Sequence, residues 1–88
     1  MDENSIKVSA RSNVAGVAGA IAGMIRDKKE AEIQVIGAGA LNQAVKAVIV
    51  ARGFLAPEGT EICVVPSFAE ASISGEDRTA IRLKVITR

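Results

Sequence analysis

The chain has 88 residues, 49% of them hydrophobic, and its eleven basic and ten acidic residues leave a formal net charge of +1. This apolar content excludes a disordered tail, and the near balance of charges excludes the strong positive field of most nucleic-acid-binding proteins. A chain of this length predicts a single domain over residues 1–88, with a modest core that oligomerisation would help to stabilise.

The chain begins with a predicted strand over residues 6–10, where apolar and polar side chains alternate and Ile6 and Val8 face inward. The next three residues, Arg11-Ser12-Asn13, form a predicted turn. Either of its last two residues is a suitable N-cap, because its side chain can accept a hydrogen bond from an unpaired amide of a following helix.

A first helix is predicted over residues 14–28, where apolar residues recur at helical spacing. Its expected core-facing residues are Val14, Val17, Ala18, Ile21 and Ile25. Small residues form a smooth strip beside them, namely Gly16, Gly19, Ala20 and Gly23. Each glycine costs about 1 kcal/mol relative to alanine in a helix. We therefore expect a neighbouring helix or strand to approach this strip closely.

The central stretch, from Glu32 to Leu55, organises the rest of the chain. It predicts a buried strand over Ile33–Ile36, a turn at Gly37-Ala38-Gly39 and a helix over residues 40–54. The expected apolar face of this helix comprises Leu41, Ala44, Val45, Val48 and Ala51, flanked by Ala47, Val50 and Phe54 on one side and Ile49 on the other. A helix this apolar needs cover on a second side, so we expect a homodimer or a higher oligomer.

The C-terminal part predicts a turn at Pro57-Glu58-Gly59 and two more strands. Its predicted segments are a strand over 62–65, an extended arm over 68–73, a hairpin tip at 74–77 and a strand over 79–87. Pro66 confines the continuation of the third strand to a sheet edge or a bulge. In the last strand, Ile81, Leu83 and Val85 are predicted to face one way, with Arg82 and Lys84 facing the other. The order β-α-β-α-β-β predicts an α+β fold, a two-layer sandwich of helices on a four-stranded sheet.

The glycine turn at residues 37–39 is the most suggestive motif, but it is not a dinucleotide fingerprint. The third glycine is missing, and the motif follows the second strand of a chain too short for two mononucleotide-binding halves. A helix start nevertheless offers unpaired N–H groups that suit a phosphate, and Arg11-Ser12-Asn13 precedes another helix start. If the first two strands are parallel neighbours, both turns emerge at the same sheet edge. Ordinary turn chemistry is the alternative explanation.

Enzyme chemistry finds little support in the sequence. There is no histidine to act as a general base, and Cys63 lies in an apolar strand, where we expect a core residue. One cysteine without histidine excludes the usual zinc sites, so we expect no metal, no cofactor and no small-molecule substrate. A single cysteine, an acidic N-terminus and the absence of a membrane-length apolar run favour a cytoplasmic protein with no membrane partner.

Several segments together resemble a known family: Lys7-Val8-Ser9-Ala10, Ser12 to Gly23, Ala31 to Ala47, Ala51-Arg52-Gly53-Phe54 and Glu76 to Ile81. They look like the bacterial stage V sporulation protein S family, which is similar in fold to the Alba-type chromatin and RNA-binding proteins. The resemblance implies an Alba-like fold, dimerisation, a regulatory role in endospore formation without a defined reaction, and DNA or RNA as a partner.

Alba-type proteins place basic residues in the turn after the first strand, in the turn before the second helix and on the last hairpin. Here the first turn keeps Arg11, the second has no arginine, and the hairpin sets Glu76 and Asp77 against Arg78. The resemblance therefore implies weak or shape-directed contacts by backbone amides and a few side chains. The candidate nucleic-acid contacts are Arg11, Ser12, Asn13, Gly37, Ala38, Gly39, Asn42, Gln43, Lys46 and Arg78.

Two other functions stay open at this point. The first is a protein-interaction module in septation or spore-coat assembly, favoured by the near-neutral charge and by Ile49 and Val50 beside a narrow polar stripe. The second is an enzyme or small-ligand binder that uses the glycine turn.

Overall fold

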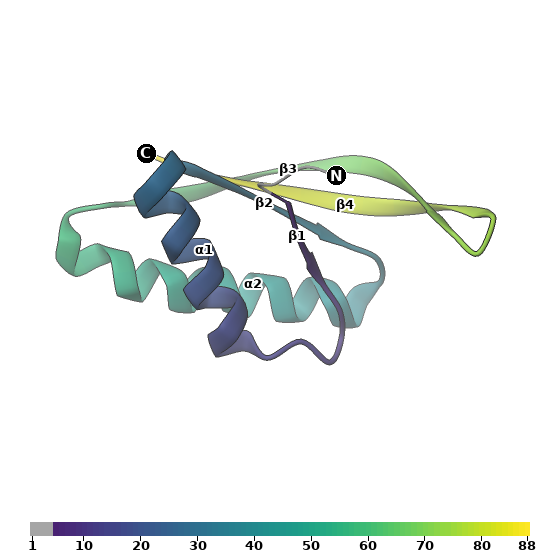
Figure 1. Ribbon diagram of the computed structural model, residues 1–88, viewed down its shortest axis with the longest axis horizontal. Helices are drawn as coiled ribbons and strands as arrows, with labels where there is room; N and C mark the ends of the chain where they lie inside the picture. The colour runs from purple at the N-terminus through teal and green to yellow at the C-terminus, as the bar shows by residue number, and fades with distance from the viewer. Residues whose placement is uncertain (1–4) are drawn as a thin grey trace.

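The computed structural model describes residues 5–88, which form two α-helices, one short 3-10 helix and four strands. In chain order they are β1 (Ser5–Val8), α1 (Val14–Lys28), β2 (Glu30–Val35), α2 (Ala38–Leu55), η1 (Ala56–Glu58), β3 (Ile62–Ile73) and β4 (Glu76–Thr87) (Figure 1). The predicted β-α-β-α-β-β order is confirmed.

The strands form one mixed sheet in the order β1-β2-β4-β3. β1 pairs with β2 in parallel, whereas β4 pairs antiparallel with both β2 and β3. Both helices lie on the same side of this sheet (Figure 1). The molecule is therefore the predicted α+β sandwich of two layers, and it fits an Alba-like arrangement. Val8, Ile33 and Val85 are buried between the layers.

Two strand boundaries differ from the prediction. β1 ends at Val8 instead of residue 10, because the chain turns at Ser9, whose backbone N–H donates to the hydroxyl of Ser12 at 2.8 Å. β2 begins at Glu30 and ends before Ile36, because its pairing with β4 extends back to Glu30, opposite Ile86. The end of β1 is therefore set by the following turn, and the start of β2 by its pairing with β4. The local amino-acid composition sets neither boundary.

Helix α1 has the predicted bounds. Asn13 is its N-cap, and the side-chain oxygen of Asn13 accepts a hydrogen bond from the backbone N–H of Gly16 at 2.8 Å. The helix ends where Lys29 adopts a left-handed conformation, with φ of 67°. Of the predicted core stripe, Ala18, Ile21 and Ile25 are buried and Val14 and Val17 are half-buried, and Ala22 joins the buried set.

The smooth strip of α1 does not have the close neighbour that we expected. A Cβ atom added to Gly19 or Gly23 would meet nothing within 4 Å, and one added to Gly16 would meet only the cap residue Asn13. The expectation of a close approach by another helix or strand of the same chain is therefore wrong. These glycines lie on the outer, exposed side of the helix layer.

Helix α2 begins at Ala38, two residues earlier than predicted, so Gly39 lies inside its first turn. Its buried residues are Ala40, Ala44, Ala47, Ala51 and Leu55. The buried face of α2 is therefore rotated about the helix axis relative to the predicted face. Ala44 and Ala51 are buried as predicted, but Val45 is 46% exposed. The physical reason is that a row of alanines lets α2 pack closely under the sheet and α1, which leaves the larger residues outside.

The third strand runs without interruption through Pro66 to Ile73. β3 is an edge strand, so the missing N–H of Pro66 can face outward without breaking the ladder. Ser74 and Gly75, with φ of 53° and 81°, make the hairpin turn, which is shorter than predicted. Beyond Val35, the last paired residue of β2, the two strands pair only with each other. This projecting hairpin, residues 68–81, is called the arm below, and it extends along the longest axis of the molecule (Figure 1).

The sheet face opposite the helices, called the open face below, carries polar side chains. Three pairs cross it: Lys7 with Gln34 at 3.1 Å, Arg82 with Glu32 at 3.3 Å and Lys84 with Glu30 at 3.7 Å. Arg82 and Lys84 point away from the helices, as predicted. Cys63, expected in the core, is half-buried at the position opposite Ile86 on this face. Within residues 5–88, neither helix combines the length and apolarity of a transmembrane segment.

Candidate functional site

The turns that precede the two helices meet at one edge of the sheet, as the sequence predicted. The side-chain Nε2 of Gln43 donates a hydrogen bond to the backbone oxygen of Ser12 at 3.1 Å. A Cβ atom added to Gly39 would lie 2.9 Å from Cβ of Ala10, so the two backbones approach closely there. We call residues 9–13 together with residues 37–43 the turn corner.

The first turn is held by its own side chains. The hydroxyl of Ser12 accepts the N–H of Ser9 at 2.8 Å, and the hydroxyl of Ser9 accepts the N–H of Arg11 at 3.2 Å. Asn13 caps α1 through its side chain. The side chains of Ser12, Asn13 and Gln43 therefore fix the shape of the turn corner, whereas the side chain of Arg11 is exposed.

The N-terminus of α2 has no side-chain cap, whereas the N-terminus of α1 is capped by Asn13. The N-cap of α2, Gly37, has φ of 91° and no side chain, and the first turn contains no acidic residue. Because a helix cannot pair its first amides internally, the N–H groups of Ala38, Gly39 and Ala40 point out of the helix end. The helix dipole adds partial positive charge at the same place, which suits an anion.

Charge is distributed unevenly along the described chain. Four cations are engaged with carboxylates elsewhere: Arg26 with Glu58 at 2.7 Å, Arg52 with Glu61 at 2.6 Å, Arg82 with Glu32 and Lys84 with Glu30. The turn corner contains no acidic residue, and Arg11 and Lys46 make no ion pair within residues 5–88. A chain that is nearly neutral overall therefore presents a locally positive corner.

The ion pairs at the other end of the helices are tight. Arg26 contacts both carboxylate oxygens of Glu58, and these hydrogen bonds lower the pKa of Glu58. Hydrogen bonds from Arg52 lower the pKa of Glu61 to about 2. These pairs connect α1 to η1 and α2 to the start of β3, so they fix the end of the molecule away from the turn corner.

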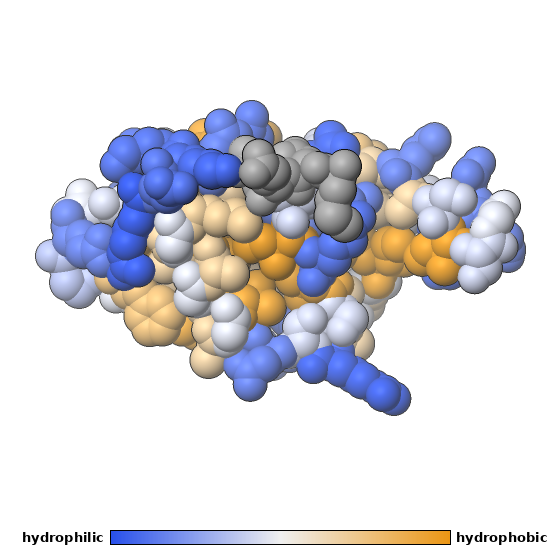
Figure 2. All heavy atoms as spheres, in the orientation of Figure 1, coloured by the Kyte–Doolittle hydropathy of each residue, from blue (hydrophilic) through white to orange (hydrophobic). Residues whose placement is uncertain are grey.

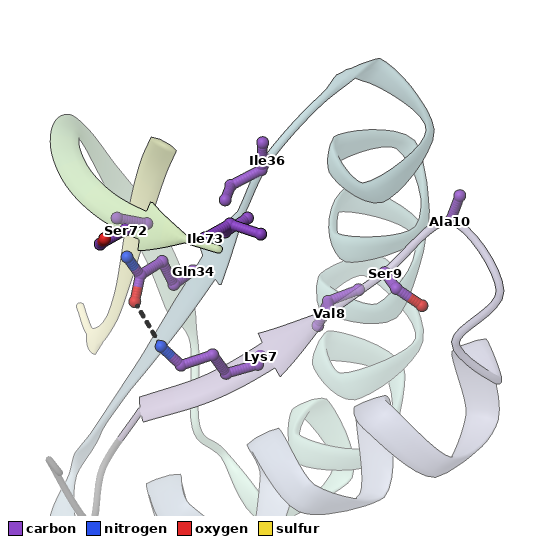
Figure 3. A pocket seen from close by; sticks show the side chains of 9 residues that line it. Lys7, Val8, Ser9, Ala10, Gln34, Ile36, Ser72 and Ile73 are labelled. Atoms are coloured by element: carbon purple, nitrogen blue, oxygen red, sulfur yellow. Dashed lines mark hydrogen bonds between the residues drawn. The ribbon is translucent and has the colours of Figure 1, made fainter. Parts of the chain in front are cut away.

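A pocket of about 430 Å³ lies beside the turn corner, between the ends of β1 and β2 and the end of the arm (Figure 3). It is lined by Lys7, Val8, Ser9, Ala10, Gln34, Ile36, Ala71, Ser72 and Ile73. Because Arg78 is paired with Ala71 in the arm, the pocket also brings that predicted contact residue toward the turn corner. Lys7, Gln34 and Ser72 were not predicted as neighbours. The register of β1 and β2 pairs Lys7 with Gln34, and the arm carries Ser72 to the same pocket.

Apolar side chains also reach the surface. Arg52 lies on the same flank of α2 as Val45 and Val48, and its ion pair with Glu61 shows that this flank faces the start of β3. On β3, Pro66 and Phe68 are paired with Leu83 and Ile81 on the helix side, and Phe68 is 79% exposed. Ile49, which extends the flank on α2, is 64% exposed. Val45, Val48, Ile49, Pro66 and Phe68, of which Val48 is half-buried and packs against the core, are together called the α2–β3 strip below. Other apolar residues reach the surface in the middle of the molecule and along the arm (Figure 2).

The chain matches a known protein family. A family model described as Stage V sporulation protein S matches residues 4–88, nearly the whole chain. The match includes both turns of the corner, the pocket residues and the arm.

Proposed function

The chain belongs to the stage V sporulation protein S family, and we propose that it is a non-enzymatic sporulation regulator that binds nucleic acid at the turn corner as a homo-oligomer. The observation that carries this proposal is the meeting of two helix starts at one exposed, acid-free corner. The uncapped amides of α2 and the cations Arg11 and Lys46 are suited to the phosphate groups of a nucleic acid.

The small number of cations sets the expected mode of binding. Phosphate contacts supply most non-specific affinity, and each cation contributes to its salt dependence. The turn corner contains one cation, Arg11, with Lys46 one turn further along α2 and Arg78 in the arm, so it would bind weakly as a monomer. Two corners in one assembly would act together and raise the effective affinity.

The α2–β3 strip supports the oligomeric part of the proposal. Ile49 and Phe68 are large apolar side chains that are more than half exposed. A second copy that covers both of them would form an apolar contact of the kind that exposed patches mark. The strip lies on the helix side of the molecule, whereas the polar pairs occupy the open face. A second copy on the strip would therefore leave the open face and the pocket accessible.

The test is a binding titration of labelled duplex and single-stranded probes at low salt. Arg11→Glu combined with Lys46→Glu should weaken binding by more than tenfold if each lost contact removes about 1 kcal/mol. Lys29→Glu is the control, because Lys29 is exposed at the opposite end of α1, roughly 22 Å along the helix. Absence of binding by the wild-type protein, or equal effects of the corner and control variants, would contradict the proposal.

A protein-interaction module is the second candidate function, and the exposure of Phe68 and Ile49 is the observation that favours it. In that case a partner other than a second copy would cover the α2–β3 strip. Partner capture lost with Ile49→Glu, together with no nucleic-acid binding, would favour this candidate over the first.

A further inference from the structure

We infer that the pocket between the open face and the arm accepts a single unstacked nucleobase with its attached phosphate. This inference rests on the proposed function and specifies the form of nucleic acid. The pocket volume of about 430 Å³ lies within the range of small-molecule sites. Walls from β1, β2 and the arm surround it, so it is a concave site and not a flat surface patch.

The chemistry of the lining suits a planar, polar-edged ring. Ile36 directly follows β2 and Ile73 is the last residue of β3 in the arm, and both line the pocket (Figure 3). Apolar side chains of this kind cover the faces of an unstacked base, as aromatic side chains do in other single-strand sites. Phe68 is exposed but faces the helix side of the sheet, next to Glu70, which would repel phosphate.

The polar groups of the pocket are oriented for base edges. Gln34 Oε1 accepts a hydrogen bond from Lys7 Nζ at 3.1 Å, which fixes the amide so that its Nε2 points away from Lys7. The two N–H groups of Gln34 Nε2 make no hydrogen bond with another residue in the described part of the chain. They can donate to the carbonyl and ring-nitrogen acceptors on a base edge.

Cations lie where the phosphate of such a nucleotide would be. Lys7 lines the pocket, and Arg78 projects on the same side of the arm as its pocket-lining partner Ala71. Within residues 5–88 no acidic side chain lines the pocket itself, although Glu76 is paired with Ile73 at its rim. Ser9 and Ala10 belong both to the pocket and to the turn corner, so a strand with phosphates on the corner can place one base in the pocket.

This geometry favours single strands and loops over duplexes. A base within a duplex must be unstacked and unpaired before it enters a pocket, at a cost of a few kcal/mol. A base in a single strand or loop is already available. We therefore assign the pocket to single-stranded or looped nucleic acid, and the same chemistry would also accept a free mononucleotide.

The test compares three probes: a short labelled single-stranded RNA, a duplex of the same sequence, and free adenosine and uridine monophosphates. Ile73→Glu and Gln34→Ala should each weaken single-strand binding by about tenfold, the scale of one lost base contact, and leave duplex binding close to the control. Val65→Glu is the matched control, because Val65 is 51% exposed and Ile73 is 45% exposed on the same strand and on the same sheet face. Gln34→Ala introduces no charge, so it keeps the test valid if Ile73→Glu perturbs the arm.

The outcomes separate the pocket from the proposed function. If Ile73→Glu and Gln34→Ala bind single strands as tightly as Val65→Glu does, the pocket assignment is wrong. The proposed function would still stand in that case. Wild-type protein that binds no strand or duplex would overturn the proposed function. The wild-type protein could bind a mononucleotide but no strand, and both pocket variants could lose that binding. This result would identify a free nucleotide as the ligand of the pocket.

Discussion

Gly39 and Ala10 lie so close that a Cβ atom added to Gly39 would be 2.9 Å from Cβ of Ala10. The start of α2 thus packs against the turn after β1 with no room for a side chain. We expect Gly39→Ala to lower the free energy of unfolding by about 1–2 kcal/mol, because one turn must move. Gly53→Ala is the control: its added Cβ meets nothing within 4 Å, so it should raise stability by up to about 1 kcal/mol. Urea denaturation measures both, and equal effects would contradict the close packing.

A second prediction concerns the hydrogen bond that joins the two turns. Gln43→Ala removes the 3.1 Å bond to the backbone oxygen of Ser12 and should lower the free energy of unfolding by about 1 kcal/mol. Asn42→Ala is the neighbouring control, since Asn42 is exposed and makes only a 3.4 Å contact with Gln43. Amide hydrogen exchange near residues 9–13 should become faster in Gln43→Ala alone. Unchanged exchange there would show that the bond does not hold the turn corner.

A third prediction follows from the ion pair between Arg52 and Glu61. The pKa of Glu61 is lowered from 4.5 to about 2, because the carboxylate accepts hydrogen bonds from Arg52. Protonation therefore costs more in the folded than in the unfolded state. The contribution of Glu61 is complete above pH 4.5 and is lost as the pH falls toward 2.

Thermal unfolding between pH 5 and pH 2, in roughly half-unit steps, measures this effect. The stability of Glu61→Gln should fall less steeply over that window than the stability of the wild-type protein. Glu70→Gln is the control, because Glu70 is exposed and makes no ion pair within residues 5–88. Identical slopes for all three proteins would show that the pair does not persist in solution.

A fourth prediction concerns assembly through the α2–β3 strip. Ile49→Glu should shift the sedimentation profile from oligomer toward monomer while the fold is retained, since Ile49 is 64% exposed in the single chain. Val65→Glu lies on the open face and should not change the mass. A wild-type protein that is monomeric at micromolar concentration, or an oligomer unaffected by Ile49→Glu, would rule out this surface as the contact between copies.

The sequence predicted the fold well where the local sequence pattern of a helix or strand agrees with its contacts in the folded chain. The bounds of α1 were predicted because Asn13 is a strong cap and charged residues end the helix. The predicted face of α2 was only partly right: Ala44 and Ala51 are buried as predicted, but close packing with α1 favours the row of alanines over the larger Val45. The continuity of β3 was missed because Pro66 interrupts a strand pattern, although an edge strand tolerates it.

The candidate site was predicted only in part. The meeting of the two turns follows from parallel pairing of β1 and β2, which a β-α-β order favours. The pocket could not be predicted, because it depends both on the register that pairs Lys7 with Gln34 and on the position of the arm that carries Ser72. The absence of an ion pair at Arg11 and Lys46 within residues 5–88 could not be predicted either, because it depends on which other cations pair with the carboxylates.

The amide chemical shifts of the wild-type protein during titration with single-stranded RNA provide the most direct test of the proposed nucleic-acid site. The account predicts the largest changes at residues 9–13 and 37–46, with the amides of Ala38 and Gly39 among them, and little change near Arg26 and Glu58. Changes confined to the end of the molecule with Arg26 and Glu58, or no changes at any RNA concentration, would contradict it.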